Sequence, residues 1–172
     1  MVNEIILIAV VIVLIFLGLF GMQHMLYRQE NKKRRFELQK ESQKAITPIR
    51  MRAYERLSLL LERTQPEHML MDKDLLSMSV VQLEQDLLQT IRLEFDHNMS
   101  QQIYVSDEVW NMLIGARDEM AAFITTMAHQ LPQGSTAMDY AKTLIKAYHQ
   151  NGDTPHELAL DRLKQEAKAC MI

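Results

Sequence analysis

The sequence predicts an all-α protein with a single N-terminal transmembrane helix, a basic juxtamembrane helical stalk and a small irregular cytoplasmic helical bundle. Three observations predict it: a long uncharged apolar run, a following stretch without a helix breaker, and several amphipathic segments that begin with capping residues. Leu, Met, Glu, Gln, Lys and Arg are abundant, and these residues favour helices over strands. We therefore divide the 172 residues into an anchor (1–27), a basic juxtamembrane helix (28–47) and a cytoplasmic α-helical domain (48–172).

Residues 5–22, IILIAVVIVLIFLGLFGM, contain no charged side chain and no Pro. A hydrocarbon core about 30 Å thick requires roughly 20 apolar residues of helix. A cleaved secretory signal is the alternative, but such a signal starts with basic residues and ends at small ones. Here Glu4 carries the only side-chain charge before the run, and Gln23, His24 and Met25 follow it. We therefore expect an uncleaved membrane anchor.

The basic residues near this run predict its orientation. No Lys or Arg precedes the run, and five follow it closely: Arg28, Lys32, Lys33, Arg34 and Arg35. Lys and Arg beside a membrane helix stay on the cytoplasmic side. We expect the N-terminus outside, the head in the cytoplasm, and these five side chains at the membrane surface. There they would attract anionic lipid, at about 1 kcal/mol per basic residue.

The net charge of −3 conceals two oppositely charged regions. Residues 28–44 carry seven basic and three acidic side chains, whereas residues 45–172 carry twelve basic and eighteen acidic ones, a net charge of −6. An acidic head argues against a nucleic-acid partner, because phosphates require a basic face. Cys170 is the only cysteine, so no intramolecular disulfide can form, which agrees with a reducing compartment.

The cytoplasmic part is expected to form about five helices after the stalk. No helix breaker occurs from Gln23 to Ile46, so the anchor helix should continue as a solvated stalk. Thr47 and Pro48 then predict a joint, with Thr47 as the cap of a new helix and Pro48 at its first position. The expected helices are 48 to about 63, 80 to about 98, 107 to about 130, one after Thr136 that stops at Asn151, and one from Pro155. Residues 64–78, where a short helical turn could occur, and residues 99–105 have no clear assignment.

Four polar residues have the spacing of helix caps. Ser79 precedes Gln82 by three residues, which is the spacing of a capping box. Thr136 with Asp139 has the same spacing, and Ser106 precedes two acidic residues in a predicted first turn. The strongest helix start is Thr154-Pro155-His156-Glu157, because it combines a cap, a Pro at the first position and a Glu at the third.

One pair of residues has the spacing of a metal ligand set. Glu94 and His97 form an E-x-x-H motif on a predicted helix, as in di-iron carboxylate bundles. Such a site requires further carboxylates from facing helices, and the sequence offers only this one motif. The alternative, which the sequence favours, is that His97 and Asn98 end the helix and that Glu94 pairs with Arg92 or a neighbour. Because the sequence also lacks a Gly-rich phosphate loop and a nucleophile motif, we predict no cofactor, no metal and no catalytic residue.

The segment 90–110 has the densest mixture of aromatic, amide and acidic side chains. Aromatic residues are enriched at binding hot spots. The segment therefore provides the candidate partner-binding residues, which are Phe95, Gln101, Gln102, Tyr104 and Trp110. The alternative is that the aromatic rings belong to the core at a helix–helix corner, and the apolar helical face around Trp110 favours it.

Two stretches of the chain carry a family resemblance. KKRRFELQKESQKAITPIRMRAYERLSLLLER and LLQTIRLEFDHNMSQQIYVSDEVW, within residues 28–120, resemble an uncharacterised family of small single-pass membrane proteins from Bacteroidota. The resemblance implies a bacterial inner-membrane protein. It assigns no activity, substrate, cofactor or functional residue.

These observations predict a membrane-tethered, non-enzymatic adaptor or accessory subunit that binds a protein of an inner-membrane complex through its helical head. A structural homo-oligomer assembled through the heads is an alternative. Gly18 and Gly21 are three positions apart, so the anchor lacks the G-x-x-x-G face that drives many membrane-helix dimers. A metal-dependent enzyme that uses Glu94 and His97 is a further alternative.

Overall fold

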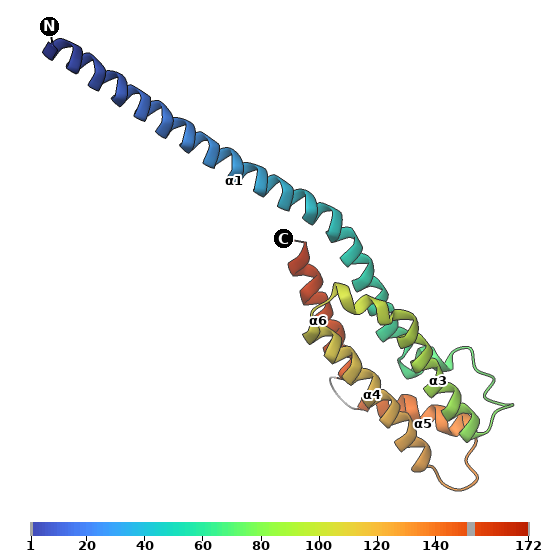
Figure 1. Ribbon diagram of the computed structural model, residues 1–172. Coiled ribbons are helices and arrows are strands. Elements are labelled where there is room, and N and C mark those ends of the chain that lie inside the picture. The colour runs from blue at the N-terminus through green and yellow to red at the C-terminus, as the bar shows by residue number, and fades with distance from the viewer. Residues whose placement is uncertain (1, 151–153, 172) are drawn as a thin grey trace. The chain divides into compact units, whose positions relative to one another are not determined.

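The computed structural model describes the backbone of residues 2–150 and 154–171, and the side chains of residues 16–25, 27–150 and 154–171. Every regular element in these residues is helical, so the predicted all-α class is confirmed for this part of the chain (Figure 1). The elements are α1 (Val2–Arg63), α2 (Pro66–Leu70), α3 (Val80–Asn98), the 3₁₀-helix η1 (Met99–Tyr104), α4 (Asp107–His129), α5 (Ala137–Gln150) and α6 (Pro155–Cys170).

The chain forms two compact units, residues 1–46 and residues 47–172. The first unit is a single stretch of helix, the N-terminal part of α1. The second unit, which we call the head, contains the remainder of α1 and all other elements.

For most of the predicted membrane helix, the structure does not describe the side chains. Of the run 5–22, only residues 16–22 have described side chains. Among the fully described residues we find no helix whose apolar stretch is long enough to cross a bilayer. The side chains of residues 16–22 are all exposed.

The predicted helix start at Thr47 and Pro48 is wrong. Helix α1 continues through this position, and Pro48 lies inside it. Proline has no N–H and cannot donate to the carbonyl of Lys44, four residues earlier, and its ring also crowds that carbonyl. The flanking residues contain no Gly and many strong helix formers, so the helix continues despite this local cost.

The core of the head is built from one apolar face of each long helix. Helix α4 packs against α3 and α6, and α5 packs against α2, α3 and α4. The face predicted for α1 is confirmed, because Tyr54, Leu57, Leu60 and Leu61 are buried. Helix α3 contributes a stripe at helical spacing that buries Leu83, Leu87, Ile91 and Phe95. Burial of each such side chain contributes roughly 1.5–3 kcal/mol, so these stripes hold the bundle together.

The caps predicted at Ser79, Ser106, Thr136 and Thr154 are confirmed. The Ser79 hydroxyl accepts from the Gln82 amide at 3.2 Å, and the Gln82 side chain accepts from the Ser79 amide at 2.9 Å. Thr154 and Glu157 form the same reciprocal pair at 3.3 and 2.9 Å. Ser106 accepts from the Val109 amide at 3.3 Å. Each pair satisfies amide groups that the first turn of a helix leaves without partners.

The two unassigned segments both contain helical turns. Residues 64–78 contain the five-residue helix α2, which buries Met69 and Leu70 against the core. Residues 99–104 form η1, which follows α3 directly. Short 3₁₀-helices are frequent at helix ends and as connectors, where they supply few sequence signals.

Candidate functional site

The candidate partner-binding residues are divided between the core and the surface. Phe95 is 3% exposed and Gln101 is 8% exposed. The Arg117 guanidinium lies 5.5 Å from the centroid of the Phe95 ring. Both side chains therefore belong to the interior of the head, and for Phe95 this agrees with the alternative that the ring is a core residue.

The other three candidates remain accessible around η1 and the start of α4. Gln102 is exposed, and Tyr104 and Trp110 are half-buried. Trp110 packs against the core cluster with part of its ring. The backbone carbonyl of Tyr104 accepts from Arg50 Nε at 3.0 Å, which fixes the end of η1 to α1. At this corner of the head the Gln102 amide is exposed and the rings of Tyr104 and Trp110 are partly accessible.

Glu94 and His97 line a small hollow of about 210 Å³ between α1 and α3. Two arginines of α1 lie in the same hollow. Arg63 pairs with Glu94 at 3.7 Å, and Arg56 donates to the Asn98 side chain at 3.2 Å and to the His97 carbonyl at 3.4 Å. Glu94 pairs with a basic side chain as expected, but its partner in the structure is Arg63 of α1 rather than Arg92.

The charges around this hollow weigh against a bound cation. Two guanidinium groups lie where a metal ion would need further anionic ligands. The described part of the chain contains no cluster of three His, Cys, Asp or Glu side chains that could hold a metal ion.

The carboxylate of Glu166 on α6 accepts several hydrogen bonds from described residues of the head, and its side chain is 12% exposed. It accepts from Arg50 at 3.2 Å and from the Tyr54 hydroxyl at 3.1 Å, both on α1. It also accepts from the Ser106 amide at 3.0 Å and from the Ser106 hydroxyl at the start of α4. We call Arg50, Tyr54, Ser106 and Glu166 the Glu166 cluster.

The electrostatics of the Glu166 cluster follow from burial and charge. Arg50 donates to the Tyr54 hydroxyl at 2.6 Å and lies 5.6 Å from the centroid of its ring. Burial, followed by the nearby Glu166 carboxylate, raises the pKa of Tyr54 to about 12. Tyr54 therefore stays protonated at neutral pH and acts as a hydrogen-bond donor to Glu166.

Sequence reasoning missed this cluster for a physical reason. The residues that donate to Glu166 lie 60 to 116 positions away from it along the chain. Glu166 lies on the last helix among exposed polar residues, which is the pattern of a solvated face. No local spacing marks such a residue as a partner of Arg50.

An exposed ion pair accompanies the cluster one turn earlier on α6. Arg162 makes two parallel hydrogen bonds to Glu108 of α4, at 2.9 and 2.7 Å. These bonds lower the pKa of the Glu108 carboxyl. Two contacts therefore join α4 and α6 at this end. Glu108 of α4 accepts from Arg162 of α6, and Glu166 of α6 accepts from Ser106, the N-cap of α4.

A second buried polar contact joins α6 to the end of α1. His156 is 1% exposed, and its Nε2 atom lies 3.0 Å from the hydroxyl oxygen of Thr64, which is itself buried. Burial lowers the pKa of His156 to about 4. The imidazole is therefore neutral at pH 7, and the contact is part of the core.

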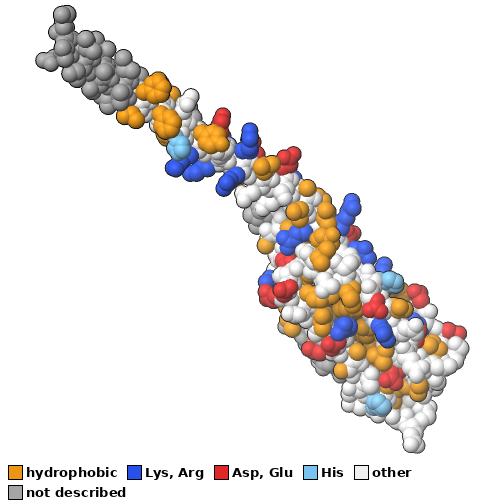
Figure 2. Space-filling model, in the orientation of Figure 1, with side chains coloured by type: hydrophobic (Ala, Val, Ile, Leu, Met, Phe, Trp, Pro, Cys, Tyr) orange, Lys and Arg blue, Asp and Glu red, His pale blue; other side chains and the backbone are white. Residues whose placement is uncertain are grey.

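The described part of the N-terminal unit has exposed apolar side chains followed by basic ones. Figure 2 shows hydrophobic side chains next to the undescribed region and then Lys and Arg along the same helix. All five predicted membrane-surface residues are exposed: Arg28, Lys32, Lys33, Arg34 and Arg35.

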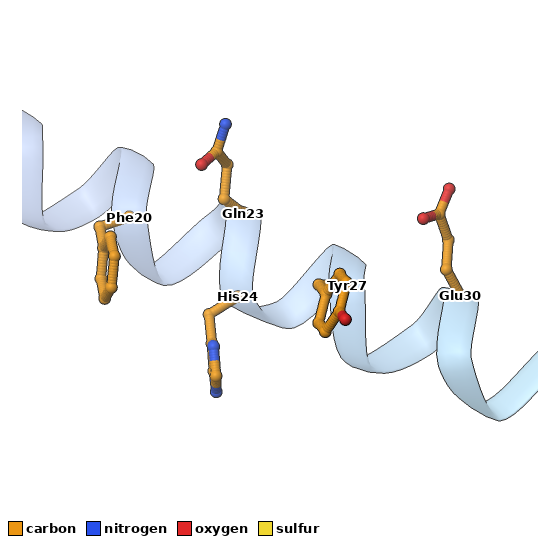
Figure 3. A pocket seen from close by; sticks show the side chains of 5 residues that line it. All are labelled: Phe20, Gln23, His24, Tyr27 and Glu30. Carbon is orange, nitrogen blue, oxygen red and sulfur yellow. The ribbon is translucent and has the colours of Figure 1, made fainter.

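A shallow hollow on this helix is formed by α1 alone (Figure 3). Phe20, His24 and Tyr27 point to one side of the helix, and Gln23 and Glu30 point to the other. Side chains of one helix cannot enclose a ligand, so this hollow is not a small-molecule site. It marks the change from apolar to polar side chains along α1.

The chain matches the model of a family of unknown function (DUF7935) over residues 1–170. It belongs to the DUF7935 family. The prediction of an uncharacterised family is thereby confirmed, and the DUF7935 match covers both the N-terminal unit and the head. No curated protein and no solved structure matches the chain.

Proposed function

We propose that this DUF7935 protein is a membrane-tethered, non-enzymatic adaptor or accessory subunit of a bacterial inner-membrane complex. In this proposal the N-terminal part of α1 anchors the chain, the basic residues lie at the cytoplasmic surface, and the head binds a protein partner. The proposal rests on one observation, which is the distribution of apolar side chains around α1.

Large apolar side chains surround α1 on all sides just before the basic residues. Phe16, Leu17 and Phe20 are 72%, 62% and 67% exposed, and Leu19 and Met22 are similarly exposed. Successive residues of a helix are rotated by about 100°, so these five positions are spread around its circumference. A helix that is apolar all round requires an apolar environment on every side, either a protein core or a bilayer. In the described residues of this unit, α1 is the only regular element, so no second element supplies such a core there.

The residues that follow have the chemistry of a membrane interface. Tyr27 and Arg28 lie five and six positions after the apolar run that ends at Met22, and both are exposed. Tyr is enriched at membrane–water interfaces, and Arg can extend its charged group to the headgroups from an apolar stem. The exposed basic residues beyond them favour the cytoplasmic leaflet, where anionic lipids lie.

The head supports a binding role better than a catalytic one. Its most polar constellations are paired internally, as the Glu166 cluster and the Arg63–Glu94 pair illustrate. The accessible side chains at the corner of η1 and α4 include Gln102, Tyr104 and Trp110. Attachment to the membrane would raise the effective concentration of the head for a partner in the same membrane.

Cys170, the only cysteine, allows a direct test of membrane topology. Intact bacterial cells that express the full chain are treated with a membrane-impermeant maleimide before and after lysis. We expect Cys170 to react only after lysis, and an Asn3→Cys variant in a Cys170→Ser background to react in intact cells. Labelling of Cys170 in intact cells, or release of the chain by an alkaline carbonate wash, would contradict the anchored orientation.

Site-specific photo-crosslinking tests the adaptor role. A photoreactive amino acid replaces Gln102 at the proposed binding corner or, as a matched control, the exposed Gln133 at the opposite turn after α4. We expect a discrete membrane-protein adduct from position 102 and none from position 133. An adduct with twice the mass of the chain would instead indicate the homo-oligomer, and equal adducts from both positions would refute a specific binding corner.

A further inference from the structure

We infer that Glu166 is a releasable latch that holds the last two turns of α6 against α1 and the start of α4. This conformational device is independent of the proposed function. It follows from the contrast between the many polar contacts of one carboxylate and the weak apolar packing of the residues around it.

The carboxylate brings three segments together. Arg50 and Tyr54 donate to it from α1, and Ser106 donates through both its amide and its hydroxyl from the N-terminus of α4. Hydrogen bonds to a charged group are stronger than bonds between neutral groups. The partial positive charge at the start of α4 adds a further attraction for the carboxylate.

The apolar contribution beyond Leu163 is small. Leu163 is fully buried, but of the next seven residues only Ala167 and Cys170 pack against the core, and both are partly exposed. Lys164, Gln165, Lys168 and Ala169 are exposed. Because hydrophobic stabilisation scales with buried apolar area, two small side chains cannot hold two helical turns by themselves. The position of these turns therefore depends on Glu166.

The contacts on the N-terminal side of the latch limit the size of the released segment. The Arg162–Glu108 pair and the buried Leu163 attach α6 to the head independently of Glu166. Loss of the Glu166 contacts should release residues 164–171 and leave the earlier turns in place. Release would also leave the Ser106 amide and the Tyr54 hydroxyl without their acceptor.

Hydrogen exchange of the purified full chain in detergent tests the latch. The informative variant is Glu166→Gln, which keeps the shape of the side chain and removes its charge. Asp161→Asn is the matched control, because this exposed carboxylate on the same helix makes only a 3.7 Å pair with Lys164. We expect amide exchange in residues 164–171 to accelerate about tenfold or more in Glu166→Gln, with exchange in α2 and α5 unchanged.

Cys170 and Arg50 provide two further measurements. In the open state the Cys170 thiol should react faster with a maleimide, in parallel with amide exchange. Arg50→Gln should have the same local effect, and the double variant should add little to either single change, because both residues act through one contact. Exchange of residues 164–171 in Glu166→Gln at the rate of the wild type, a uniform acceleration across the head, or fully additive effects of the two changes would each overturn the latch.

Discussion

The tautomer of His156 follows from the single proton of the Thr64 hydroxyl. That hydroxyl donates to the carbonyl of Leu60 at 2.8 Å, so it can only accept from His156 Nε2. Nε2 therefore carries the proton. Nδ1 is unprotonated, and it accepts no hydrogen bond from a described residue. A second proton on this ring would create a buried cation without an acceptor, which explains the lowered pKa.

Acidification should therefore destabilise the head through His156. The native pKa is about 4 and the ordinary value is 6.5, so the unfolded state binds the proton first as the pH falls. The contribution of this residue is complete above pH 6.5 and declines progressively towards pH 4, by on the order of 3 kcal/mol in total. Chemical denaturation at several pH values should show this loss in the wild type and a smaller one in His156→Gln. Parallel pH profiles would contradict the assignment.

Removal of the Tyr140 hydroxyl should destabilise the core. This fully buried group donates to the carbonyl of Ile124 at 2.7 Å and joins α5 to α4. Tyr140→Phe leaves that carbonyl without its side-chain donor and should lower the free energy of unfolding by about 1–2 kcal/mol. Tyr148→Phe is the comparison, because its hydroxyl lies 3.3 Å from Thr154 and is only half-buried. Denaturant unfolding should give the smaller loss for Tyr148→Phe, and the reverse order would count against this account.

At the scale of elements, the helices of the head begin where side chains satisfy their first amides. The capping boxes of α3 and α6 use neighbouring residues, so they form as soon as the local chain turns. The faces of these helices then decide which side is buried. Local chemistry therefore sets the starts of the elements, and packing sets their neighbours.

Loss of the α6 cap should weaken the start of that helix. Thr154→Ala removes the hydroxyl that accepts from the Glu157 amide and should cost about 1 kcal/mol. Hydrogen exchange should accelerate first at residues 155–158. Ser79→Ala, which removes the corresponding cap of α3, serves as the control and should act on the first turn of α3 instead. Acceleration at the same residues in both variants would mean that the effect is not a local cap.

At the scale of the whole molecule, the separation of charge along the chain is the property with the widest consequence. The residues that follow the apolar segment are basic, whereas the head is acidic. An anionic membrane surface would therefore act on the two regions in opposite directions. Under the proposed function, the anionic leaflet attracts the basic residues and repels the acidic head. Under the proposed function, this separation fixes the orientation and keeps the surface of the head available.

Neutralisation of the basic residues should therefore weaken the orientation. Replacement of Lys32, Lys33, Arg34 and Arg35 by Gln leaves the apolar segment intact and removes most of the bias that favours a cytoplasmic head. We expect a fraction of Cys170 to become reactive towards the impermeant maleimide in intact cells. Replacement of Lys40 and Lys44, which lie further along the helix, should change the labelling less. Equal labelling in both variants would refute the orientation mechanism.

The sequence by itself determined the helical class, the capped helix starts and the buried faces of α1 and α3. These features depend on residues three or four positions apart, and such spacing is visible in one chain. The prediction from sequence failed at Pro48. Residues that are typical of a helix start occur there within a longer helix.

Only the tertiary structure decided three features of the head. These are the burial of Phe95 and Gln101, the hydrogen-bond donors that surround Glu166, and the neutral state of His156. Each depends on groups that folding brings together from distant parts of the chain, such as Arg50 with Glu166 across 116 residues. Burial and charge at a site are properties of the packed neighbours, and local sequence patterns do not specify which neighbours those are.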